Sequence, residues 1–98
     1  MVNLVFTGIA RKDPAVHITE TGNTVATFPV EIREQPHVPP TTVEVVAIGN
    51  QGTYAQQVIK KDSLVLVAGW FCVEQKRGND YVTVKAKHLR ALIIERSS

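Results

Sequence analysis

Residues 41–66, TTVEVVAIGNQGTYAQQVIKKDSLVL, decide the predicted fold. The apolar run over 41–48 is rich in β-branched residues, which favours a strand. Apolar residues then recur at helical spacing and predict a helix over 51–61. A second apolar run begins at Ser63, so the stretch predicts strand, helix, strand. The residues at helical spacing are Ala55, Val58 and Ile59.

The rest of the chain has the pattern of strands joined by turns. Gly8 and Gly69 each lie inside an apolar run, where a glycine marks a bulge or a sharp bend. Pro29 also lies in such a run and predicts an edge position or a bulge, because proline has no N–H to donate. Loops are predicted over 34–40, which holds three prolines, and over the polar residues 74–80. The five predicted strands cover residues 2–10, 25–32, 41–48, 63–73 and 81–94, with a short extended piece over 16–20.

Five strands with one helix between the third and the fourth predict an all-β protein. Two of the strands carry a bend, which favours closure into a barrel. The five-stranded oligonucleotide/oligosaccharide-binding (OB) Greek-key barrel has this layout. A ferredoxin-like sandwich would need a second helix between strands, and the sequence predicts none. We therefore expect a single OB-fold domain over residues 1–98.

Composition restricts the protein class only loosely. The net charge of +2 and the pI of about 8.9 allow a polyanionic partner without requiring one. Cys72 is the only cysteine, so an internal disulfide is excluded and a reducing compartment fits. We see no secretory signal, and the apolar runs are shorter than the ~18 residues of a spanning helix. We expect a cytoplasmic protein without a membrane partner.

An ordered set of residues extends along nearly the whole chain: Gly8, Arg11, Asp13, Pro14, Thr21, Gly22, Val25, Ala26, Thr27, Phe28, Val45, Val46, Gly49, Ala55, Lys60, Lys61, Ser63, Leu64, Val65, Val67, Gly69, Tyr81 and Thr83. This set and its spacing resemble the bacterial single-stranded DNA-binding proteins. The resemblance implies an OB barrel that assembles as a dimer or tetramer and binds single-stranded DNA. It implies no cofactor and no catalysis. A basic groove would hold phosphates and aromatic side chains would stack on bases.

Three positions of the third predicted strand depart from the family's pattern. Where the family carries a tryptophan, a basic residue and a phenylalanine, this chain has Thr42, Glu44 and Ile48. Two stacking platforms are missing and one charge is reversed, and stacking contributes roughly 1–3 kcal/mol per base. The family's acidic C-terminal tail is not present before Ser98. A short, tail-less barrel is also similar to the primosomal protein PriB, which binds single strands as a dimer and touches a restart helicase.

Trp70 is the most informative candidate site residue. Alternation along the fourth predicted strand points it outward, where it would stack on a base. The outward neighbours are apolar as well, so the same row also fits a subunit interface. Both interpretations stay open. The alternation places Val65, Val67, Phe71 and Val73 inward and Leu66, Ala68, Trp70 and Cys72 outward.

The candidate phosphate contacts lie in the first long loop, in the last hairpin and on the last strand, where basic residues alternate. Their ordinary alternative is a set of solvated surface charges. Tyr81 would stack on a base or close the hairpin by cross-strand packing. The first strand is the expected subunit contact, by resemblance. The predicted nucleic-acid-binding residues are Arg11, Lys12, His17, Trp70, Lys76, Arg77, Tyr81, Lys85 and Lys87.

The sequence predicts a protein that binds single-stranded DNA with little sequence preference and acts in replication, recombination or repair. RNA remains a second ligand class, and replication or primosome proteins are the expected partners. No catalytic motif or metal spacing of the three histidines supports an enzyme. The alternative function is a protein–protein interaction module whose DNA binding is weak or lost. The substitution Trp70→Ala separates the two, because it weakens DNA binding in the first case and the oligomer in the second.

Overall fold

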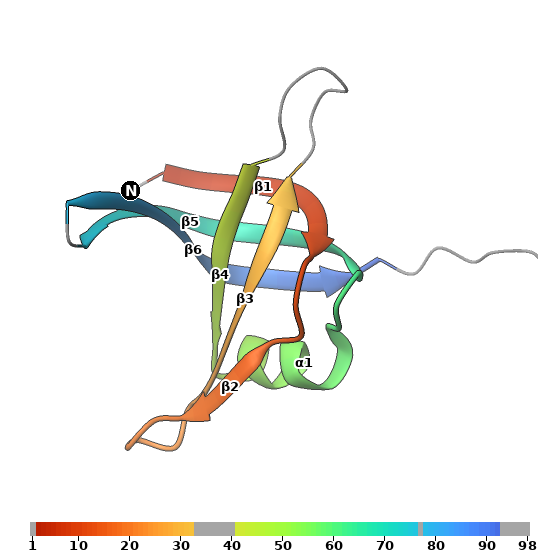
Figure 1. Ribbon diagram of the computed structural model, residues 1–98. Helices are drawn as coiled ribbons and strands as arrows, with labels where there is room; N and C mark the ends of the chain where they lie inside the picture. The colour runs from red at the N-terminus through yellow and green to blue at the C-terminus, as the bar shows by residue number, and fades with distance from the viewer. Residues whose placement is uncertain (1, 33–40, 77, 93–98) are drawn as a thin grey trace, which may run out of the picture.

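The computed structural model describes residues 2–32, 41–76 and 78–92 (Figure 1). The predicted loop over 34–40, Arg77 and the end of the predicted last strand at 93–94 lie outside these residues. The helix follows the fourth strand, as the pattern of residues 41–66 predicts. The elements are β1 (Val2–Ala10), β2 (Ala15–Ile18), β3 (Thr24–Ile32), β4 (Thr41–Ile48), α1 (Asn50–Val58), β5 (Leu64–Lys76) and β6 (Asn79–Ala91).

Five of the strands form a closed ring in the order β1-β5-β6-β4-β3. The ring closes because β1 pairs with β5 over most of its length and then with β3 at Ile9 and Ala10. All pairs in it are antiparallel except β4 with β6. The short β2 pairs only with β3, at the place of the predicted extended piece. The predicted five-stranded OB barrel is confirmed, with β2 as an added hairpin strand.

Gly8 pairs with Val65 of β5 and lies just before β1 gains β3 as a second partner at Ile9. A Cβ atom on Gly8 would lie 2.5 Å from Val30 Cγ1 and 2.6 Å from the Glu31 carbonyl oxygen. Real Cβ atoms do not approach neighbours this closely, so only glycine fits where the two strands cross. The predicted bend at this glycine is therefore confirmed, and it is the corner that closes the barrel.

Pro29 is accommodated in β3 because no described strand pairs with β3 at the point where an N–H of residue 29 would be directed. In an antiparallel strand the N–H and C=O of one residue point to the same edge. The Pro29 carbonyl accepts from the Arg11 N–H at 2.9 Å, on the edge away from β4. On that edge β2 pairs only as far as Thr27, and β1 pairs from Val30 onward. Pro29 occupies the gap between them, which agrees with its predicted edge position.

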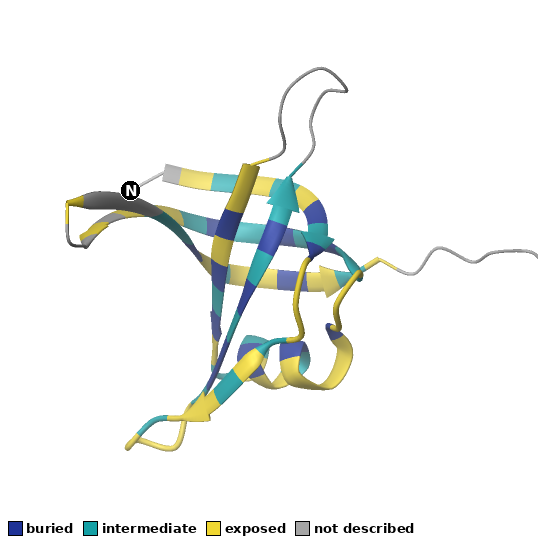
Figure 2. Ribbon diagram, in the orientation of Figure 1, coloured by how far each residue is buried: buried dark blue, intermediate teal, exposed yellow. Residues whose placement is uncertain are grey.

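The core fills the ring, and α1 covers one end of it (Figure 2). Ala55 and Ile59 are fully buried, whereas Val58 is 39% exposed. The predicted helix over 51–61 is thus too long, and the prediction of a buried Val58 is wrong. The helix ends at Val58 because the next residue, Ile59, is extended and only its N–H continues the helical bonding. The fully buried large side chains are Phe28, Val30, Val45, Ile59, Val65, Val67, Val84 and Leu89.

The β5–β6 hairpin extends past the end of the barrel. Phe71 and Val73, predicted to point into the core, are 36% and 56% exposed. The described pairing of β1 with β5 ends at Phe71, and that of β4 with β6 begins at Thr83, so no other described strand covers the hairpin beyond them. The predicted loop over 74–80 is also mostly strand, since β5 continues to Lys76 and β6 begins at Asn79.

Candidate nucleic-acid interface

A β-bulge in β6 reverses the alternation of its side chains. The register passes from Ala68↔His88 to Gly69↔Ala86, which leaves Lys87 as an extra residue. Strict alternation from Lys85 through Lys87 would have placed Leu89 on the surface, yet Leu89 is fully buried. The bulge therefore adds His88 to the exposed side of β6. We call Trp70, Lys85, Lys87 and His88 the β5–β6 face.

Trp70 lies half-buried at the centre of this face, between two lysines. It is in register with Lys85 on β6 and with Asn3 on β1. The Lys87 Nζ lies 5.8 Å from the centroid of its ring, which is within cation–π range. Such a contact contributes about 0.5–1 kcal/mol at an exposed site, less than the roughly 1–3 kcal/mol of a stacked base.

The β5–β6 face is connected to the outer surface of β3 and β2 by one row of side chains. Each member pairs in register with the next across the sheet, and all point away from the core. Neighbouring strands lie about 4.8 Å apart, so three strand spacings cover roughly 14 Å along the surface from β3 to β5. We call it the transverse row; in order from β2 to β1, its members are Ala15, Thr27, Val46, Lys85, Trp70 and Asn3.

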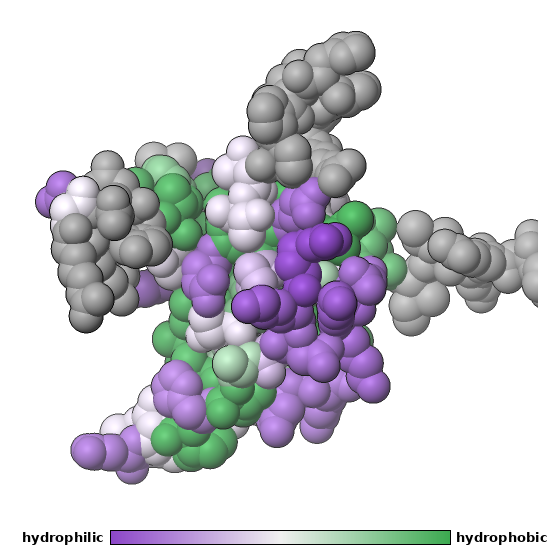
Figure 3. Space-filling model, in the orientation of Figure 1, coloured by the Kyte–Doolittle hydropathy of each residue, from purple (hydrophilic) through white to green (hydrophobic). Residues whose placement is uncertain are grey.

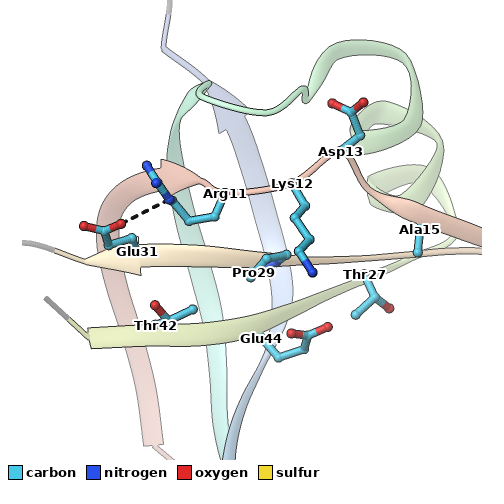
Figure 4. A pocket seen from close by; sticks show the side chains of 9 residues that line it. All are labelled: Arg11, Lys12, Asp13, Ala15, Thr27, Pro29, Glu31, Thr42 and Glu44. Atoms are coloured by element: carbon cyan, nitrogen blue, oxygen red, sulfur yellow. Dashed lines mark ion pairs between the residues drawn. The ribbon is translucent and has the colours of Figure 1, made fainter.

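The far end of the transverse row enters a hollow of about 450 Å³. The link between β1 and β2 forms one wall, and the outer sides of β3 and β4 form the floor (Figure 4). Hydrophilic side chains gather over this link (Figure 3). Two of the departing positions, Thr42 and Glu44, lie on the floor, whereas Ile48 is half exposed and does not line it. We call this hollow the groove; its lining residues are Arg11, Lys12, Asp13, Ala15, Thr27, Pro29, Glu31, Thr42 and Glu44.

Carboxylates offset the cations of the groove. The Arg11 Nε lies 3.2 Å from Glu31 Oε2, and its Nη1 lies 4.0 Å from Asp62 Oδ1. The Asp13 carboxylate accepts from the Lys61 N–H at 2.8 Å. Two cations and three carboxylates line the groove, which gives a formal charge of −1. The two lysines of the β5–β6 face give +2.

The structure brings together only part of the predicted site. Arg11 and Lys12 line the groove, and Trp70, Lys85 and Lys87 share the β5–β6 face. These two groups occupy different parts of one outer surface rather than a single rim. The transverse row connects the parts.

The remaining predicted residues lie elsewhere. His17 is exposed on β2 but does not line the groove. Lys76 and Tyr81 are placed by their backbones near the end of the β5–β6 hairpin, and Arg77 lies outside the described residues. The sequence analysis did not predict that His88 lies on this face, because strict alternation places it on the opposite side of the strand from Lys85. The sequence feature that could have indicated it is the apolar Leu89, which follows Lys85 and Lys87 at the same alternation.

An apolar strip borders Trp70. Leu66, Ala68 and Cys72 are half-buried on the same side of β5, so the prediction of an exposed Cys72 is only partly met. Val5, which pairs with Ala68, is 70% exposed. Within the described strands, the edge of β1 away from β5 acquires a partner only at Ile9. This strip and this edge of β1 lie next to each other on the described surface.

The chain belongs to the single-strand binding protein family, whose model matches residues 1–93. Solved structures with the same fold include the second single-stranded DNA-binding protein of Mycobacterium smegmatis. It is 17% identical with a TM-score of 0.83, and the match covers 99% of this chain and 97% of that one. The SSB domain of a Synechococcus protein is 13% identical with a TM-score of 0.78, covering 91% and 93%.

The wild-type single-stranded DNA-binding protein of Thermus aquaticus is 18% identical with a TM-score of 0.81. The match covers all of this chain but only 43% of the Thermus aquaticus chain. At these identities the structures establish the OB fold, and the family model establishes the family. No curated protein sequence matches the chain.

Neither a metal centre nor a membrane span is found in the part of the chain that the structure describes. Across residues 2–32, 41–76 and 78–92, His, Cys, Asp and Glu side chains form no group of three or more that would hold a metal ion. Over the same residues, no helix has the length and apolar character needed to cross a membrane.

Proposed function

We propose that this chain binds single-stranded DNA across the transverse row, with its main contacts on the β5–β6 face. The observation that carries the proposal is the position of Trp70, in register with Lys85 and beneath the Lys87 ammonium. An aromatic platform flanked by cations is the arrangement that binds bases and phosphates together. Membership of the single-strand binding protein family supports it.

On this proposal a base stacks on Trp70 and displaces Lys87, whose ammonium then contacts a phosphate. Lys85 holds the next phosphate, and the strand continues along the transverse row toward Lys12. Stacking and phosphate contacts do not read base edges, so sequence preference is slight. The protein acts by binding and protecting strands in replication, recombination or repair, without catalysis.

We further propose that the chain works as a homo-oligomer, a dimer or a tetramer. The edge of β1 that lacks a described partner before Ile9 supports this. A second β1 would satisfy its backbone groups by strand addition, which is a common mode of association. Primosome or other replication proteins would contact this assembly.

The test is a titration of intrinsic tryptophan fluorescence with oligo-dT at low and at high salt. Trp70 is the only tryptophan, so the signal reports this one place. We expect saturable quenching at micromolar protein or tighter, with the binding weakened by salt. The proposal fails if there is no quenching and no gel shift at low salt. Oligo-rU in a parallel titration distinguishes DNA from RNA.

A protein–protein interaction module is the second candidate function. The apolar strip around Trp70, with Val5 70% exposed beside it, favours this candidate. Under it, Trp70→Ala dissociates the oligomer in sedimentation equilibrium and leaves binding to oligo-dT absent or unchanged. Under the first candidate the oligomer keeps its mass and the affinity for oligo-dT falls.

A further inference from the structure

We infer that Glu44 sets an upper limit on the affinity of this chain for single-stranded nucleic acid, because its carboxylate repels the strand at the groove. The inference rests on the proposed function, and it assigns a residue that acts against binding. Glu44 lies on the floor of the groove, at the point where the transverse row enters it.

The neighbours of Glu44 across the sheet do not neutralise it. It pairs with Pro29 on β3 and with Thr83 on β6, neither of which carries a charge. The ion pairs within the described residues involve Arg11, Glu31 and Asp62 and leave Glu44 out. Glu44 is also exposed, so its carboxylate lies in contact with water. A phosphate placed over the groove therefore meets an unpaired negative charge.

Of the two cations of the groove, only Lys12 is left to offset this carboxylate, because Arg11 is held in an ion pair. The Arg11 guanidinium is held 3.2 Å from Glu31, a carboxylate whose side chain is only 12% exposed. A phosphate must compete with that ion pair for the same donors. Lys12 is the remaining cation of the lining, and Glu44 opposes it within the same hollow (Figure 4). The groove as a whole therefore contributes little to holding a strand.

The expected effect of removing the charge follows from surface electrostatics. Charge pairs at exposed positions change a binding free energy only modestly, so Glu44→Gln raises the affinity for oligo-dT about 3-fold at low salt. Glu44→Lys changes the charge by two units, and we expect a gain of about 10-fold. Both gains disappear near 1 M salt, where the Debye length is about 3 Å.

The experiment measures anisotropy of labelled oligo-dT with wild type, Glu44→Gln and Glu44→Lys. The matched controls are Glu20→Gln and Glu20→Lys, which change the net charge equally at an exposed residue that does not line the groove. Gains at residue 44 that exceed those at residue 20 support the inference. Equal gains at both positions mean a general charge effect and overturn it.

The wild-type result separates this inference from the proposed function. If wild type binds and the Glu44 variants bind no better, the inference alone is wrong. If wild type does not bind but Glu44→Lys does, the inference stands and the proposed function fails for the natural chain. If none of the proteins binds, both fail. Urea unfolding of each variant ensures that the compared proteins are equally folded.

Discussion

The groove and the β5–β6 face lie on the same outer surface of the barrel, yet they differ in how their cations are paired. Arg11 in the groove is 3.2 Å from Glu31. Lys87 on the β5–β6 face lies over the Trp70 ring, and Lys85 is in register with Trp70 and Val46, which carry no charge. A phosphate therefore reaches the lysines without breaking an ion pair of the described residues, whereas at the arginine it must compete with Glu31.

This difference shows that a basic residue in the sequence does not by itself give a positively charged surface, because nearby carboxylates in the folded chain offset its charge. In the groove Arg11 is paired with Glu31 from β3, and Lys12 shares the lining with Glu44 from β4, with which no ion pair is found among the described residues. The barrel places these strands side by side at a fixed register. The net charge of each region therefore depends on which residues the strand register brings together. The following substitutions test this dependence, from the largest expected effect to the smallest.

Replacing Gly69 should remove the β5–β6 face together with much of the stability. A Cβ atom at this position would overlap the Lys85 carbonyl, and the bulge that exposes His88 begins here. We expect Gly69→Val to lower the free energy of unfolding by about 3 kcal/mol, because overpacking against a backbone has no simple relief. Urea unfolding measures this.

The neighbouring Ala68 provides the control for Gly69→Val. Ala68 points outward, away from the core, so Ala68→Val adds the same kind of side chain without a backbone overlap. We expect its unfolding free energy to stay within about 1 kcal/mol of wild type. Equal losses in the two variants would mean that the bulge has no special role.

Removing the aromatic platform should give the largest loss of binding. Trp70→Ala eliminates the stacking surface and is expected to weaken oligo-dT binding by roughly 5- to 150-fold, the equivalent of about 1–3 kcal/mol for one stacked base. Anisotropy of labelled oligo-dT measures it, because the variant has lost its own fluorophore. Trp70→Phe is the control and should retain part of the affinity. An unchanged affinity in the alanine variant would locate the binding elsewhere.

Much of the fold could be predicted because its signals are local. Gly8 and Gly69 marked the bend and the bulge in advance, and Pro29 marked an edge position. These residues report their own backbone constraints, which do not depend on the rest of the chain. The solvent exposure of Phe71 and Val73 depends instead on where β1 and β4 stop pairing with the β5–β6 hairpin. Alternation along β5 alone cannot show this.

The candidate site was harder to predict than the fold. The pattern Lys85-x-Lys87 indicated an exposed side of β6. The bulge that adds His88 to this side arises from the pairing of β6 with β5, which the sequence of β6 alone does not show. The ion pair of Arg11 with Glu31 joins residues twenty positions apart, through the crossing of β1 and β3. Charge pairing of this kind follows from topology and is invisible in a single sequence.

Single lysine substitutions compare the two regions directly. Each phosphate contact on a single strand contributes about 0.7 to the slope of log K against log salt. We expect Lys85→Gln to reduce the slope by about 0.7, and Lys12→Gln to reduce it by less than about half of that. Oligo-dT titrations at several salt concentrations give both slopes. Equal reductions would show that the groove holds phosphate as well as the β5–β6 face does.

The smallest effect is expected where α1 supports the end of β6. The Ala91 N–H donates to the Tyr54 hydroxyl at 2.8 Å, and the Leu89 N–H donates to Gln51 Oε1 at 2.9 Å. Tyr54→Phe removes one acceptor while it keeps the ring that packs beside Arg90. We expect a loss of about 1 kcal/mol in urea unfolding, the usual value for one hydrogen bond.

Oligo-dT affinity should remain unchanged in Tyr54→Phe, because the hydrogen bond lies beyond the bulge and away from Trp70. An unchanged affinity would mean that the binding surface is held by β4, β5 and β6 and not by the helix. A parallel fall in stability and affinity would instead make α1 a support of the β5–β6 face. Gln51→Ala, at the neighbouring hydrogen bond, should then show the same coupling, since Leu89 immediately follows His88 on β6.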